Sequence, residues 1–195
     1  MRRFFYLYAE ACADAEGRQF FVDASTEDLT EIIAAGFFEG NGPLNLASFP
    51  SIYGTRPPQT GEHVLDFGKG FGSLIIVSDR VRQKMAKLAD QFVQFVPYPI
   101  NSSDGELQEE CFYLLRISHL IECIDRDRCT VYGDDWSPMP NGRLRFSGKV
   151  YYSHELLAGY PIVSCQETRK ILFREDVVDL LAEFSGATFT AVRVT

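Results

Sequence analysis

Four segments of the chain show the spacing of apolar and polar residues that is typical of amphipathic helices. The clearest is 79–90, in which Val81, Met85 and Leu88 follow one another at intervals of four and three residues. Residues at this spacing share one face of a helix, so we expect this stripe to be buried. Ser78 lies where an N-cap residue would precede the helix. The other three helices are expected over 25–35, 154–158 and 175–185, where a serine cap or a glycine stop marks an end.

Short runs of apolar residues predict β-strands between these helices. The expected strands are 3–9, 19–22, 74–77, 92–100, 112–117, 144–146, 170–173 and 188–194. Segment 106–124 is ambiguous, because its start also fits a helix, and segments 40–63 and 132–143 have the Gly, Pro, Asn and Ser content of loops. The pattern therefore predicts an α+β fold with mixed or antiparallel sheets and a few short helices. A single domain over 1–195 is expected, with 1–100 and 101–195 as candidate subdomains.

Two stretches of the chain repeat one pattern of an apolar strand, a three-turn amphipathic helix and another strand. They begin near residues 73 and 169, and an ungapped offset of 96 residues superposes them. The apolar pairs that coincide at this offset are Val81 with Val177, Met85 with Leu181, Leu88 with Phe184 and Val96 with Val192. Any two strand–helix–strand units look alike at this level, so both a chance likeness and two related halves stay open.

Composition and charge limit the kinds of molecule that the protein is expected to bind. The 195 residues carry a net charge of −8, which disfavours a nucleic acid as a direct partner and favours a basic protein. No apolar run approaches the roughly 18 residues that cross a membrane. The apolar run after Arg3 has six residues, fewer than the roughly 7–15 of a signal peptide, so it is expected to be a strand. Five cysteines without a C-x-x-C pair predict free thiols in a reducing compartment, and hence a cytoplasmic location.

The candidate motifs for chemistry are weak. The glycine cluster 66–72 is followed by a strand and not by a helix, so a tight turn is expected there instead of a phosphate-binding loop. His119 and Cys123 are four residues apart, but a zinc site needs three or four ligands and no second cluster has a matching spacing. We therefore expect no catalytic residues, no metal site and no cofactor.

An acidic stretch offers the best candidate for a contact surface. Residues 101–136 hold nine acidic and three basic residues, and residues 1–40 hold eight and three. The candidate binding residues for a basic protein are Glu122, Asp125, Asp127, Asp134, Asp135 and an exposed Trp136. Two other interpretations stay open: a solvated loop with local Asp–Arg pairs, and a small hydrolase or transferase that uses Asp134 and Asp135 as a carboxylate pair.

Residues 74–195 resemble the bacterial immunity proteins of family eleven from polymorphic toxin systems. The resemblance is carried by FVPYPI at 95–100 and by FYLLRISHLIECIDRDRC at 112–129. Asp125 occupies the place of an Asp that this family tends to show after an apolar stretch, and Cys129 departs from the usual Ser. The resemblance implies a cytoplasmic protein, not an enzyme, that binds and neutralises a cognate toxin. The six candidate residues would then contact a basic face of that toxin. An interaction module without an immunity role is the remaining alternative, and the oligomeric state is left open.

Overall fold

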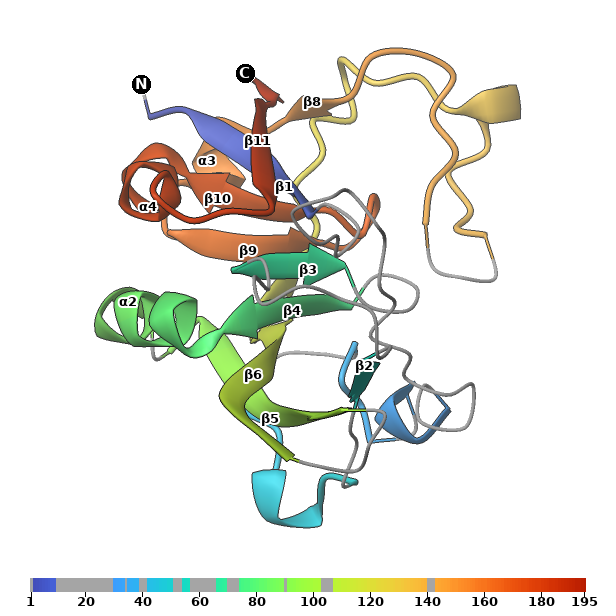
Figure 1. The fold of residues 1–195 in the computed structure, drawn as a ribbon. Helices are drawn as coiled ribbons and strands as arrows, with labels where there is room; N and C mark the ends of the chain where they lie inside the picture. The colour runs from blue at the N-terminus through green and yellow to red at the C-terminus, as the bar shows by residue number, and fades with distance from the viewer. Residues whose placement is uncertain are drawn as a thin grey trace.

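The computed structural model describes most of the chain, and its elements confirm the α+β class (Figure 1). The described residues are 2–9, 30–33, 35–38, 42–50, 54–56, 66–69, 74–89, 91–102, 107–139 and 143–195. Their strands form two five-stranded sheets and one two-stranded sheet.

The first sheet has the strand order β2-β5-β6-β4-β3. Its strands are β2 (Gly54–Arg56), β3 (Phe67–Lys69), β4 (Ile75–Ser78), β5 (Val93–Ser102) and β6 (Leu107–Ile117), and helix α2 (Asp79–Ala89) connects β4 to β5. Both β4 and β5 run antiparallel to β6, which lies between them. Segment 106–124 is thus a strand over most of its described length, because residues 111–117 pair in register with residues 93–99 of β5.

The second sheet has the strand order β11-β1-β10-β9-β7. Its strands are β1 (Phe4–Ala9), β7 (Leu120–Ile121), β9 (Ile162–Cys165), β10 (Ile171–Arg174) and β11 (Ala187–Ala191), and helix α4 (Glu175–Leu181) connects β10 to β11. The remaining elements are β8 (Tyr151–Tyr152), which pairs with β12 (Arg193–Val194), the helix α3 (His154–Leu157) and the 3-10 turns η1 (Leu46–Ser48) and η2 (Tyr132–Asp134).

The two sheets share one local topology, which supports the interpretation of two related halves. In the first, β4 and β5 flank the antiparallel strand β6; in the second, β10 and β11 flank the antiparallel strand β1. In each sheet a further antiparallel strand lies beside the first strand of the unit: β3 beside β4, and β9 beside β10. The central strand β6 comes after its strand–helix–strand unit in the chain, whereas the central strand β1 comes before its unit. The similarity at an offset of 96 residues therefore marks two units with the same strand arrangement.

The helices of the two units pack into one apolar core between the sheets. Val81 and Met85 of α2 and Val177 and Leu181 of α4 are all at most 1% exposed and belong to one cluster of buried residues. The helical stripe predicted over 79–90 is thus confirmed for Val81 and Met85. Burial of side chains this large is the main favourable term that holds the halves together.

Asp66 links the two halves by hydrogen bonds. Its Oδ1 accepts a bond from the Ser78 hydroxyl at 2.8 Å, and its Oδ2 accepts bonds from the amide and the hydroxyl of Ser185, both at 3.2 Å. Ser78 ends β4 directly before α2, and Ser185 follows α4. The Asp66 carboxylate is buried, so its removal would leave these donors without a charged acceptor.

Replacing Asp66 with Ala is expected to lower the free energy of unfolding by about 1–2 kcal/mol, because the donors at Ser78 and Ser185 lose a charged acceptor. Urea unfolding followed by far-UV circular dichroism measures this change. The control is Asp179→Ala, an exposed residue of α4, which should change stability by less than about 0.5 kcal/mol. Equal stability of the two variants would show that Asp66 does not join the halves.

Several sequence expectations differ from the structure. Segment 144–146 is not a strand: only Phe146 forms an isolated bridge, with Val131. Segment 40–63, expected to be a loop, contains η1 and β2. Of the expected helix 25–35, only 30–33 is described as helical, and the expected strand 19–22 lies outside the described residues. Strand β9 was missed because it is buried on both faces and so shows no alternation of polar and apolar residues.

Candidate functional site

A long excursion between β7 and β8, residues 122–150, is the candidate site, and we call it the arm (Figure 1). It leaves the sheets and carries η2 at some distance from them. Its two limbs lie side by side: the Tyr132 amide donates to the Arg145 carbonyl and the Ser147 amide to the Thr130 carbonyl, both at 2.9 Å. All six residues predicted to contact a partner lie on the arm.

The carboxylates at the start of the arm are paired locally. Glu122 forms an ion pair of 3.3 Å with Arg126, and both side chains are exposed. Asp125 accepts a hydrogen bond of 3.1 Å from the Asp127 amide and lies 4.0 Å from Arg128. Such exposed pairs contribute little to stability, so their side chains are free to exchange partners with a docking protein.

The carboxylates further along the arm are exposed. Asp127 and Asp135 both face solvent, and Asp134 ends η2, with its side chain outside the description. Hydrogen bonds from the hydroxyl and the amide of Ser137 lower the pKa of Asp135. An exposed carboxylate with a lowered pKa stays ionised at neutral pH, whereas a general acid needs a raised pKa. This observation argues against Asp135 as the acid of a hydrolase.

The aromatic residues of the arm do not lie as expected. Trp136 is only partly exposed, because it packs edge-on against Phe146 with ring centroids 6.4 Å apart, and the Arg126 guanidinium lies 5.2 Å from its ring. The expectation of an exposed Trp136 was therefore wrong. Tyr132 is instead 55% exposed, with Arg145 stacked 4.5 Å from its ring centroid. The sequence did not single out Tyr132, although its place beside Gly133 in a polar segment was a usable signal.

The arm as a whole is balanced in charge. Its first limb carries the acidic residues named above, but Arg143, Arg145 and Lys149 return along its second limb, so residues 122–150 hold five acidic and five basic residues. Acidic and basic residues therefore occur on the arm in equal number, so its net charge produces little long-range field.

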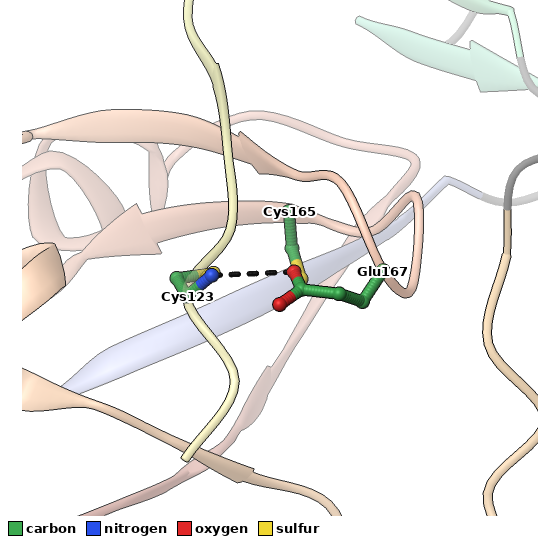
Figure 2. A group of neighbouring side chains, drawn as sticks. All are labelled: Cys123, Cys165 and Glu167. Carbon is green, nitrogen blue, oxygen red and sulfur yellow. Dashed lines mark hydrogen bonds between the residues drawn. The ribbon is translucent and has the colours of Figure 1, made fainter. Parts of the chain in front are cut away.

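The root of the arm is held by Glu167, in the turn between β9 and β10. Its buried carboxylate accepts hydrogen bonds from the amides of Cys123 and Ile124, at 3.2 and 3.4 Å (Figure 2). Its backbone carbonyl accepts a bond of 2.8 Å from the amide of Leu144 on the second limb. One residue thus anchors both limbs of the arm to the second sheet.

Two thiols share this root. Cys123 and Cys165 are fully buried, and the Cys165 thiol donates to Oε2 of Glu167 at 3.2 Å. The hydrogen bond with Cys165, together with burial, raises the pKa of the Cys123 thiol well above its usual range, so the thiol is protonated. Burial likewise raises the pKa of Cys129. These three cysteines are free thiols, as expected.

Sequence reasoning missed the Cys123–Cys165–Glu167 cluster. It considered His119 as the neighbour of Cys123, but His119 stacks between Phe92 and Tyr160, at centroid distances of 5.1 and 5.3 Å. The true neighbours of Cys123 come from the end of β9 and the turn after it, more than forty residues away, which no local spacing indicates.

Comparison with known proteins identifies the family. Residues 14–181 match the Immunity protein family (Imm11), and the chain therefore belongs to this family. This confirms the resemblance drawn from 74–195 and supports the role of an immunity protein. No curated protein matches the chain. Within the described ranges, no helix combines the length and the apolar character needed to cross a membrane.

Proposed function

We propose that this immunity protein binds a cognate toxin of a polymorphic toxin system and neutralises it, with the arm as the principal contact surface. The observation that carries the proposal is an arm that projects from the sheets and is rooted by a buried carboxylate in a member of an immunity family. An anchored loop can present side chains to a partner without a large loss of conformational entropy on binding.

The chemistry of the arm fits a toxin with a basic active-site face. Asp127 and Asp135 are exposed carboxylates, and Tyr132 offers an exposed aromatic ring between them in sequence. Nuclease toxins are one class that carries basic grooves, because they bind phosphates. The basic second limb would pair with acidic residues at the rim of such a groove, which makes recognition specific to one partner. Inhibition would follow from occlusion of the groove in the cytoplasm, where free thiols persist.

A binding role fits the arm better than catalysis. The candidate carboxylate pair lies on a projecting loop, and Asp135 is ionised and hydrogen-bonded to Ser137. An acid–base pair for hydrolysis instead needs two carboxyl groups with different environments and pKa values. We therefore propose that the protein is not an enzyme.

Co-expression tests the proposal. Cells that express the toxin domain encoded by the neighbouring gene should survive only when they also express this chain, and the two proteins should co-purify. A toxin domain from an unrelated system is the control, and it should kill cells regardless of this chain. Survival without complex formation, or no survival, would contradict the proposal.

A further inference from the structure

The cluster at the root of the arm also has the composition of a metal site. One ligand atom each from Cys123, Cys165 and Glu167 can be chosen so that all three lie within 4.8 Å of one another (Figure 2). The residues come from two separate segments: Cys123 from the start of the arm, and Cys165 and Glu167 from the end of β9 and the turn after it. All three are buried, at 0%, 0% and 4% exposure. This convergence of two thiols and a carboxylate is independent of the arm's exposed surface.

Among the residues that the structure describes, no lysine or arginine side chain pairs with the carboxylate of the cluster. In the part of the chain that the structure describes, none of the ion pairs of lysine or arginine involves Glu167. Its carboxylate is held by two amides and a thiol instead. A carboxylate removed from water is expensive unless it is paired with a cation or coordinates a metal. A bound cation would therefore supply what the surrounding side chains lack.

We propose that Cys123, Cys165 and Glu167 bind a thiophilic divalent cation of the zinc class. Two sulfur ligands and one carboxylate oxygen suit zinc, whereas magnesium and calcium prefer oxygen ligands alone. The thiols would lose their protons on binding, as ligating cysteines do. Two thiolates and the carboxylate would then supply three negatively charged ligand groups to the divalent ion.

The distances require only small side-chain movements. Two sulfurs that share a tetrahedral zinc lie about 3.8 Å apart, and a sulfur and an oxygen lie about 3.6 Å apart, given bond lengths of about 2.3 and 2.1 Å. The Cys165 sulfur and Oε2 of Glu167 are 3.2 Å apart, and no chosen pair exceeds 4.8 Å. The remaining differences are about 1 Å or less, within the reach of side-chain rotation.

From its position, the ion would stabilise the attachment of the arm to the second sheet. Cys123 lies at the start of the arm, and Glu167 hydrogen-bonds to both limbs. An ion here would join the first limb to the β9–β10 turn by coordinate bonds in addition to the hydrogen bonds. It would stabilise the folded chain by mass action, because the ligands are far apart in the unfolded chain.

Zinc and cobalt binding test the site on the full-length chain, purified under reducing conditions with a tag that does not bind metal. Elemental analysis after dialysis against zinc and then buffer should find about one zinc per chain, as expected for a single site with three protein ligands. Cobalt should give the near-ultraviolet sulfur-to-cobalt charge-transfer band, which needs no variant and reports thiolate ligation directly. Absence of both zinc and the band would overturn the proposal, and so would an oxidised Cys123–Cys165 pair that excludes the metal.

Variants locate the ion. Cys123→Ser and Glu167→Gln should each weaken zinc binding about 100-fold or more, because each removes one of three ligands. Cys129→Ser is the matched control: Cys129 is also a buried cysteine near the arm, but it bonds to the backbone of Tyr151 and should leave zinc binding unchanged. Unchanged binding in Cys123→Ser, or loss in Cys129→Ser, would overturn the assignment. Because the readout is metal content, it is independent of whether the arm binds a toxin.

Discussion

The triple variant Asp127→Ala, Tyr132→Ala, Asp135→Ala should bind the cognate toxin domain about 100-fold more weakly than the natural chain, since a few hot-spot residues at an interface carry most of its binding energy. All three side chains are exposed on the arm. Two of them are carboxylates that would pair with a basic face, and Tyr132 is a rigid aromatic residue of the type that dominates interface energetics. Calorimetric titration with the toxin domain measures the change.

A matched triple variant tests whether weaker binding comes from lost contacts on the arm or from a general loss of negative charge. Tyr8→Ala, Asp179→Ala, Glu183→Ala also removes one exposed tyrosine and two exposed carboxylates, away from the arm; Tyr8 is 57% exposed and Tyr132 55%. This control should bind as the natural chain does. If both triple variants bind equally, the arm is not the contact surface.

Glu167→Ala should lower the free energy of unfolding by about 3–5 kcal/mol. The change leaves the buried amides of Cys123 and Ile124 without an acceptor, removes the partner of the Cys165 thiol and opens a cavity. Because the same residue anchors the arm, hydrogen exchange at Cys123 and Ile124 should accelerate even under conditions in which the rest of the chain is folded. Urea unfolding and hydrogen exchange measure the two effects.

Glu155→Ala is the control for this change, because Glu155 is an exposed glutamate in α3. It should alter stability by less than about 0.5 kcal/mol. A Glu167→Ala variant as stable as this control would show that the buried carboxylate does not hold the root of the arm.

The elements that could be predicted from the sequence are those specified by local pattern. The helix over 79–90 was predicted because its apolar stripe has helical spacing, and Val81 and Met85 are indeed buried. The strand–helix–strand repeat was visible for the same reason, since each unit carries its own pattern. Strand β9 was not predictable, because a strand covered on both faces has no polar alternation to read.

The same distinction between local sequence pattern and long-range packing applies to the candidate site. The arm could be located from its polar, charged sequence, because loops are polar wherever they occur. The partial burial of Trp136 could not be predicted from the sequence, because it depends on Phe146, which lies on the other limb of the arm. Glu167 and the two cysteines meet only through the pairing of β7 with β9 and the turn after β9. Contacts that depend on sheet topology produce no recognisable residue spacing in the sequence.

The measurement that tests the central claim most directly is a titration of active toxin domain with the purified chain. If the chain neutralises by binding, toxin activity should fall linearly and vanish at about one chain per toxin, as expected for tight one-to-one binding. Inactivation by far less than one equivalent would show turnover by an enzyme, and full toxin activity at excess chain would contradict neutralisation altogether.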